Sequence, residues 1–373
     1  MKSRIITEAC VGLAILFAAC AVAGQLPAAK RKPLVPPPDQ EAKSKPTGFR
    51  FRLDPATHQR VEYALEGKIT FDQGAENYVL EWNGMDGERK KLIWTPPNKI
   101  RAEVVGRVSY YPEERLFRYT YDVSSLAESR QKLQSFYVTS PTEIVTGGNP
   151  DQTWYSSAFT PYLKRVFKVE DGWAWSQTMK GKLGLEPRQS AEGFNVVTVA
   201  VPGIVACYVR GQTDALRSSE EIPEELMEAI DQMAWKVPHG VTIGPGSPPD
   251  RLTPQGIAES LLRFLDVGKK QGWILDGSDA SAIKQVAEGI GRAVSLGDSA
   301  EVVRLSDEGI DLVDHAYERG EFLSEARGLF IYNLAALKQG MSKVGALLWH
   351  PIPGNLDGNL GNLGGTWGQT GRL

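Results

Sequence analysis

A strict alternation between residues 116 and 123 places the strongest constraint on the fold. One face of this stretch holds Phe117, Tyr119, Tyr121 and Val123, and the other holds Arg118, Thr120 and Asp122. A period of two is typical of a β-strand with one buried face. The runs at 104 to 110 and 134 to 138 are also strand-like, and Pro112 fits a turn between the first two strands. The sequence predicts three consecutive strands of one half-buried antiparallel meander.

Short strand-like runs recur over residues 49 to 211 and end at turn-forming pairs. Such pairs are Asp54-Pro55, Asn83-Gly84 and Pro96-Pro97. A run at residues 165 to 169 is also expected to be a strand. A short amphipathic helix is expected after Pro223, and no long helix precedes it. This pattern predicts an all-β antiparallel, immunoglobulin-like sandwich, which we place at residues 49–243.

Two segments of the predicted sandwich resemble uncharacterised exported bacterial β-sandwich proteins. The first runs from Arg118 to Val123 and continues with Ser129, Gln131, Leu133, Phe136 and Val138, and the second is Val201-Pro202-Gly203-Ile204-Val205. The resemblance covers residues 100 to 245. It implies a β-sandwich fold and an exported protein, and it brings no catalytic motif with it.

Residues 253–345 carry four amphipathic stripes with short connections. Thr253 before Pro254 predicts a helix start, and Gly297 before Asp298 predicts a helix end followed by a capped start. The fourth stripe consists of Ala326, Leu329, Asn333 and Leu337. Four such helices bury their stripes against one another, which predicts a small all-α antiparallel bundle. The glycines and prolines of residues 244–252 predict a linker between two domains.

The helical segment also repeats itself. Residues 262 to 286 align with 310 to 332, and this alignment matches Gly272-Trp273-Ile274-Leu275 with Gly320-Glu321-Phe322-Leu323. Each unit is a helix, a glycine stop, an apolar contact and a second helix. This segment resembles the FIMAH-type helical module of exported bacterial proteins. The resemblance implies an accessory module and carries no catalytic residue over.

The N-terminus has the pattern of an export signal. Lys2 and Arg4 precede an apolar run, and Ala21-Val22-Ala23 before Gly24 fits a cleavage site, so residues 1–23 are a predicted signal peptide. An alternative is lipidation at Cys20, because Phe17-Ala18-Ala19-Cys20 is similar to a bacterial lipobox. A membrane-spanning helix would need about 20 apolar residues, more than this run offers. We expect no transmembrane segment in the mature chain.

Two further segments have biased composition. Residues 24–48 are rich in proline and lysine, which predicts an extended tether; a contact with anionic envelope polymers is the alternative to a solvated linker. Residues 346–373 contain Gly-Asn-Leu repeats, which predict a disordered tail.

Charge and cysteine content exclude several classes of protein. The net charge is −3, and residues 254 to 340 carry nine Lys and Arg against fourteen Asp and Glu, which gives −5. A nucleic-acid partner would need a basic face instead, so none is expected. Of the three cysteines, Cys10 and Cys20 lie in the predicted signal. Cys207 is then the lone thiol of the cleaved chain and is expected to be a small buried residue of a strand.

No catalytic, metal or cofactor motif is present in the sequence. The four histidines, His58, His239, His315 and His350, are scattered singly. His315 lies among acidic residues of a helix, and a solvated face is the simpler interpretation. No nucleophile motif or phosphate loop occurs. A hydrolase with a carboxylate pair remains an alternative, because such pairs need no motif.

The sandwich is rich in tryptophan, and one group of aromatic residues is a candidate ligand-binding site: Trp154, Tyr155, Trp173 and Trp175. Coplanar exposed rings on a sheet would stack on sugars. The alternative interpretation, which we favour for Trp173 or Trp175, is that these rings fill the core of a sandwich without disulfides.

The sequence favours an exported, non-catalytic binding or structural protein of the cell envelope or the extracellular space, without a cofactor. Its partner would be a cell-wall or extracellular polysaccharide, or another envelope protein. The alternatives are a secreted carbohydrate-binding protein and a glycoside or peptide hydrolase.

Overall fold

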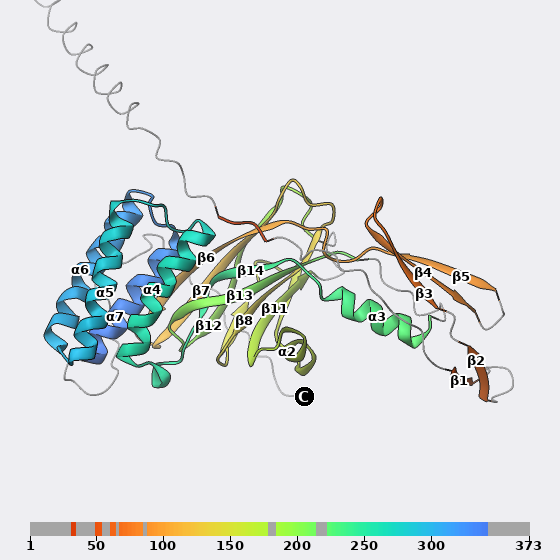
Figure 1. Ribbon diagram of the computed structural model, residues 1–373, viewed down its shortest axis with the longest axis horizontal. Helices are drawn as coiled ribbons and strands as arrows, with labels where there is room; N and C mark the ends of the chain where they lie inside the picture. The colour runs from red at the N-terminus through yellow and green to blue at the C-terminus, as the bar shows by residue number, and fades with distance from the viewer. Residues whose placement is uncertain are drawn as a thin grey trace, which may run out of the picture.

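The computed structural model describes residues 31–34, 49–53, 60–64, 67–84, 88–177, 184–213 and 222–341. Two antiparallel sheets stack as a β-sandwich, and four C-terminal helices pack beside them (Figure 1). The predicted fold class, an antiparallel sandwich followed by a helical bundle, is confirmed. The predicted signal peptide at 1–23, Cys20 and the tail at 346–373 lie outside the described residues.

The first sheet of the sandwich has the strand order β6-β7-β12-β9. Its strands are β6 (Ala102–Tyr111), β7 (Leu116–Ser125), β12 (Ser190–Thr198) and β9 (Thr146–Gly148). The alternation in β7 is confirmed: Phe117, Tyr119, Tyr121 and Val123 are fully buried between the sheets. The predicted hairpin of β6 and β7 is present as well.

The second sheet has the order β10-β11-β8-β13-β14. Its strands are β10 (Trp154–Ala158), β11 (Asp171–Gln177), β8 (Leu133–Ser140), β13 (Pro202–Gly211) and β14 (His239–Pro245). The predicted three-strand meander is wrong in its third strand, because β8 crosses to this sheet. Ser129 and Gln131 hold the crossing, through hydrogen bonds to Arg101 and to the carbonyls of Pro96 and Gln212.

The N-terminal part of the predicted sandwich range, 49–243, forms separate units. Strands β3 (Lys68–Asp72), β4 (Asn77–Asn83) and β5 (Arg89–Trp94) make their own sheet, and β1 (Phe49–Leu53) pairs with β2 (Arg60–Ala64). Helix α3 (Glu224–Ala234) lies on the three-stranded sheet, where Leu226 and Ile230 pack with Leu80. The sandwich itself therefore begins at Ala102.

The predicted strand at residues 165 to 169 is wrong. Helix α2 (Pro161–Phe167) covers the first part of this stretch, and Lys168 ends it in the left-handed region. The Oγ1 of Thr160 accepts a hydrogen bond from the amide of Leu163, and Pro161 is the first helical residue. These are the two standard signals of a helix start. Phe167 of this helix packs on Tyr137 and Tyr208, on the outer face of the second sheet.

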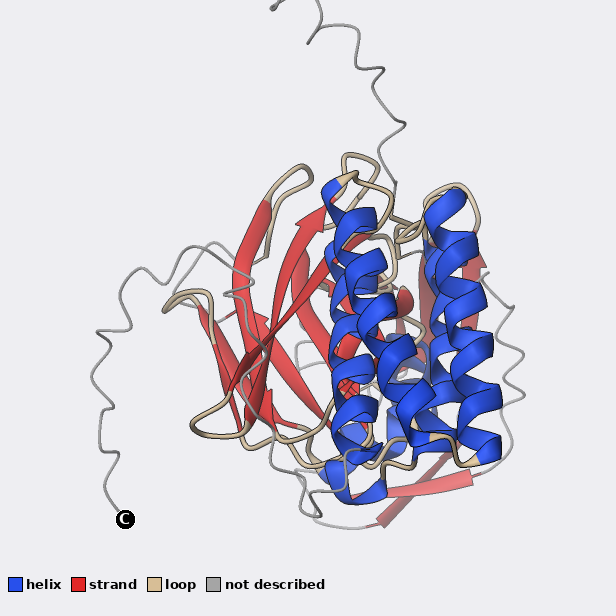
Figure 2. Cartoon of the chain, turned by 90° about the vertical axis from the view of Figure 1, so that its left-hand side faces the viewer, coloured by secondary structure: helices blue, strands red, loops and turns tan. Residues whose placement is uncertain are grey.

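The bundle consists of α4 (Pro254–Gln271), α5 (Ser278–Leu296), α6 (Ser299–Glu318) and α7 (Ser324–Met341). Figure 2 shows the four helices side by side, with the sheets behind them. The predicted caps are confirmed, because Thr253 Oγ1 accepts from the amide of Gly256 and Asp298 Oδ1 from that of Glu301. Gly297 ends α5 in the left-handed region, with φ 70°.

The internal repeat is visible as a pair of equivalent loops. Gly272 and Gly320 both have a left-handed backbone, with φ 73° and 72°. The residues that follow form an antiparallel bridge between Ile274 and Phe322: Leu275 donates to the carbonyl of Glu321, and Leu323 to that of Trp273. The two helical hairpins are thereby tied together where the aligned tetrapeptides meet.

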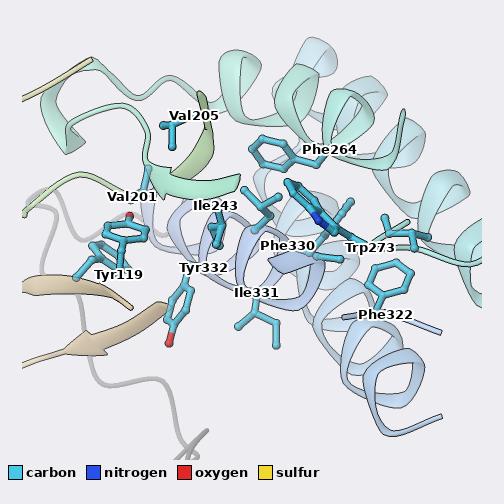
Figure 3. Packing of buried hydrophobic residues seen from close by; sticks show 14 of the residues in the cluster. Tyr119, Val201, Val205, Ile243, Phe264, Trp273, Phe322, Phe330, Ile331 and Tyr332 are labelled. Carbon is cyan, nitrogen blue, oxygen red and sulfur yellow. The ribbon is translucent and has the colours of Figure 1, made fainter. Parts of the chain in front are cut away.

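Helix α7 belongs to both halves of the molecule. Its buried residues run from Glu325 to Leu337, interrupted by Arg327. Toward the sandwich, the Tyr332 ring meets Phe117 edge-on at 5.4 Å. Toward the other helices, Phe330 packs on Phe264 and Phe322. Figure 3 shows Ile243 of β14 close to α7, so the sandwich and the bundle share one hydrophobic core.

Two close approaches around α7 require glycine, one between α7 and β6 and the other between β6 and β14. A Cβ at Gly328 of α7 would lie 2.5 Å from Val108 Cγ1, and one at Gly106 of β6 would lie 2.5 Å from Ile243 Cγ2. The predicted linker at 244–252 is also part of this packing. Gly244 and Pro245 end β14, and the short 3-10 helix η1 (Pro249–Arg251) precedes α4.

Residues 31–34, part of the predicted tether at 24–48, are bound to the fold; we call them the N-terminal strap. Leu34 is buried and pairs with Ala102, and its amide donates to the Ala102 carbonyl at 2.7 Å. The amide of Lys32 donates to the carbonyl of Gln271, at the end of α4. The strap therefore connects the edge of the first sheet to the bundle.

A buried ion pair fixes the strap. Arg31 Nε and Nη2 donate to the two oxygens of Glu325 at 2.8 and 3.0 Å, and the Glu325 side chain has 0% exposure. Glu325 Oε1 also accepts from the amide of Gly106 at 3.0 Å. Burial alone would lower the pKa of Arg31, but the hydrogen bonds and charge of Glu325 raise it above its usual range.

We expect the isolated segment 252–345 not to fold as it does in the whole chain. Removing the sandwich exposes the sheet-facing side of α7, and each large apolar side chain returned to water costs about 1.5–3 kcal/mol. A few such side chains amount to much of a domain's total stability of about 5–15 kcal/mol. Circular dichroism melting of this segment should show no cooperative transition. A sharp transition close to that of the whole chain would contradict the shared core.

Arg31→Ala should destabilise the protein by about 3–5 kcal/mol, because it leaves the buried Glu325 carboxylate unpaired. Arg304→Ala is the matched control. It removes an exposed arginine that pairs with Glu301 and Glu308 on the surface of α6, so urea unfolding should not change measurably. Equal unfolding midpoints for the two variants would contradict a structural role for the strap.

Candidate functional site

The four aromatic residues predicted as a ligand site do not share an exposed face. Trp175 is fully buried, and its Nε1 donates to the carbonyl of Gly148 at 2.8 Å. Trp154 is also buried and meets Phe194 edge-on. Trp173 is partly buried and packs on β9, where a Cβ at Gly147 would lie 2.3 Å from its ring.

Tyr155 alone of the four has an exposed side chain, at 61%. It alternates with Trp154 along β10 and therefore points away from the core. A platform that stacks on sugar rings needs at least two coplanar exposed rings, and these residues supply one. The three tryptophans lie where the packing of a sandwich without disulfides needs large side chains.

A different site lies where the sandwich meets the bundle. A cleft of about 310 Å³ opens between the start of β13, the segment that leads into α4, and the helices α4 and α7; we call it the interface cleft. Its polar lining comes from residues far apart in sequence: Ser247, Arg251, Thr253, Ser260, Arg263 and Asn333. Its apolar lining includes Ile204, Leu252, Ile257 and Phe264.

Tight backbone packing shapes one wall of this cleft. The amide of Val201 donates to the carbonyl of Ser247, and the amide of Gly246 donates to the carbonyl of Val201. A Cβ at Gly203 would lie 2.7 Å from the Cα of Gly246. The Gly-Pro segment after β14 is therefore held against β13, and it forms a fixed wall of the cleft.

Asn333 is the deepest polar group of the cleft, with 3% exposure. Its Nδ2 donates to the carbonyls of Pro202 at 2.9 Å and Leu329 at 2.8 Å. These two bonds fix the orientation of the amide. The Oδ1 accepts no hydrogen bond from any residue that the structure describes. Oδ1 is not among the fully buried atoms, so it is open to the cleft and can accept a hydrogen bond from a ligand donor.

Two arginines line the exposed part of the cleft. The side chains of Arg251 and Arg263 form no ion pair with the described part of the chain, and no Asp or Glu lines the cleft. The N-terminal turn of α4, with Thr253 and Gly256, lies in the same wall and adds a partial positive charge. The cleft therefore presents positive potential around its opening.

Sequence reasoning missed this cleft, although two signals were visible. Asn333 is a polar residue within the apolar stripe of the fourth helix. A buried amide at such a position needs hydrogen-bond partners. The glycines and prolines before α4 were interpreted as a linker, whereas close approach of two backbones also requires glycine. The cleft forms because β13 lies against α4 and α7 in the tertiary structure, and neither signal predicts this arrangement.

The other groups singled out in the sequence lie elsewhere. Cys207 is buried in β13, and burial raises the pKa of its thiol to about 12. It is therefore a neutral core residue at physiological pH. The Nδ1 of His315 lies 2.8 Å from the Asp311 carbonyl oxygen. Across the described ranges, no group of three or more His, Cys, Asp or Glu side chains could hold a metal ion.

Among the described residues, no helix combines the length and apolar character needed to cross a lipid bilayer.

Comparisons with known proteins assign no family to this chain. No protein-family model matches the chain, and no curated protein matches it. Among solved structures, the chain is similar to an uncharacterized protein from Nocardia farcinica that has an immunoglobulin-like fold. The identity is 12%, the TM-score is 0.20, and the match covers 34% of this chain and 91% of that protein. At this TM-score the likeness carries no argument about function.

We predict that Trp175→Ala destabilises the protein by about 3–5 kcal/mol, the usual cost of removing a buried tryptophan ring. Tyr155→Ala should change the free energy of unfolding by less than about 0.5 kcal/mol, because its side chain lies in solvent. Urea denaturation followed by tryptophan fluorescence measures both. A Trp175→Ala variant as stable as Tyr155→Ala would contradict the placement of Trp175 in the core.

Proposed function

We propose that this chain is an exported, non-catalytic binding protein of the cell envelope and that it binds its partner at the interface cleft. One observation carries the proposal: the cleft is lined by arginine, amide, hydroxyl and apolar groups, with no Asp, Glu, His, Cys or Lys. Arginine stays charged at all physiological pH values, and the hydroxyls have no neighbouring base in the lining. Such a lining can hold a ligand but offers no group for proton transfer.

The competing hydrolase hypothesis would need two facing carboxylates. Among the described residues, Glu325 is the carboxylate that is fully buried. Its oxygens accept hydrogen bonds from Arg31 and Gly106, and the Ser324 hydroxyl lies 3.2 Å from Oε2. A carboxylate engaged in this way is suited to structural work and not to acid catalysis, which favours the binding protein.

The N-terminal sequence supports export. Cleavage after Ala23 would leave Gly24 as the first residue, seven residues before Arg31, so the strap would remain in the mature chain. Lipidation at Cys20 would retain it as well and would attach the protein to a membrane. The resemblance of the helical segment to FIMAH-type modules fits an accessory role outside the cell.

A cell-wall or extracellular polysaccharide is the partner that we propose. The cleft combines hydroxyl, amide and guanidinium groups with partly exposed apolar side chains such as Ile204 and Leu252, and small-molecule sites commonly combine an apolar lining with a few polar groups. A cleft of this size accepts one or two sugar units at the end of a chain. Another envelope protein would need a wider surface than the cleft offers.

Two measurements test this proposal. Mass spectrometry of the protein isolated from its own cells should find Gly24, or a lipid-modified Cys20, as the first residue. The purified mature chain should sediment with insoluble peptidoglycan or with an acidic extracellular polysaccharide, and no reducing ends or free amino groups should be released. An uncleaved N-terminus would contradict export. Steady release of cleavage products would identify an enzyme, and failure to bind any of these polymers would contradict a polysaccharide partner.

A further inference from the structure

The interface cleft also carries information about the chemistry of its ligand. We propose that it binds a small, hydroxyl-bearing organic anion, of the class of a sugar acid or a sugar phosphate, as a free molecule or as the end of an acidic polysaccharide. The anionic group would lie at Arg251 and Arg263, and a hydroxyl would point at Asn333. This inference rests on the proposed function, because it names the ligand of the same site.

The first argument is the free acceptor in the cleft. Asn333 Oδ1 is fixed in place because Nδ2 is committed to the Pro202 and Leu329 carbonyls. Oδ1 is open to the cleft, so a ligand hydroxyl can replace water at an acceptor that is already oriented, and a ligand that brings such a donor gains affinity. Hydroxyl groups are donors, whereas an ionised carboxylate or phosphate oxygen is not. The deep end of the cleft therefore favours a hydroxyl and disfavours a bare anion.

The second argument is the charge at the opening. Arg251 and Arg263 have no ion-pair partner among the described residues and line one cleft, whereas Arg292, which also lacks such a partner, lies on α5 outside it. A guanidinium group forms paired hydrogen bonds with a carboxylate or phosphate and binds such groups more strongly than neutral ones. The exposed end of the cleft therefore favours an oxyanion.

The third argument is size. The volume of about 310 Å³ lies at the lower end of the range of about 300–1,000 Å³ that is usual for small-molecule sites. Two polar ends that prefer different groups, within one small cleft, require a ligand that carries both groups on one compact frame. A sugar that bears one carboxylate or phosphate meets this requirement.

Calorimetric titration of the purified mature chain tests the inference. The probes are glucuronate, glucose 6-phosphate, glucose and inorganic phosphate. At least one of the two sugar anions should bind, and glucose and inorganic phosphate should each bind at least about tenfold more weakly, since one good contact is worth about that factor. The comparison of glucuronate with glucose 6-phosphate then tells which anionic group the arginines prefer.

Variants locate the binding in the cleft. Arg251→Gln and Arg263→Gln should each weaken binding of the sugar anion about tenfold or more. The control is Arg292→Gln, which removes an exposed arginine of α5 that does not line the cleft and should bind like the unmodified protein. All three positions are exposed, so the melting temperatures should match. Asn333→Leu is the fourth variant and should weaken the sugar anions while leaving inorganic phosphate unchanged.

Several results would overturn the inference. They are equal binding of glucose and glucuronate, inorganic phosphate binding as tightly as the sugar anions, both arginine variants binding like Arg292→Gln, and no binding of any probe. If the protein still sediments with peptidoglycan or with the acidic polysaccharide, any of these results would leave the proposed function standing. Conversion of a probe during the titration would instead contradict the proposed function itself.

Discussion

The burial of α7 on two opposite sides is the constraint on which the rest of the structure depends. An ordinary surface helix buries one stripe, but α7 packs Phe330 against the helices and Tyr332 against the sandwich. Because β6 and β14 are edge strands of the two sheets, a helix packed against both completes the cores of both halves. The close approach at Gly328 brings the backbone of α7 against Val108 of β6 and Ile243 of β14.

The same helix brings together parts of the chain that are distant in sequence. Glu325 near its start ties the N-terminal strap to β6, and Asn333 two turns later ties α7 to the start of β13. The first contact is a buried ion pair. Loss of either partner would leave an unpaired buried charge and destabilise the folded protein. The second contact sets the deepest point of the interface cleft. Stability and the candidate site therefore depend on one element.

The sequence predicts local features well and their assembly poorly. The period of two in β7 and the caps at Thr253 and Asp298 depend on nearby residues alone, and all are present in the structure. The transfer of β8 to the second sheet depends on hydrogen bonds from Gln131 to residues far away in sequence. The hydrophobic pattern of the sequence does not predict such bonds. The interface cleft was missed for the same reason, because its wall joins β13 to residues that resemble a linker. Among the aromatic residues, pattern alone could not separate Tyr155 from its buried neighbour Trp154, since both suit a strand.

Hydrogen exchange of the whole chain measures most directly whether the sandwich and the bundle form one unit. Buried amides exchange through the opening of cooperative units, and the free energy of that opening can be followed as denaturant is raised. The account predicts that the slowest amides of α7 and those of β13 and β14 open with the same free energy. A lower opening free energy for all four helices, with the sandwich still protected, would show two independent domains and contradict it.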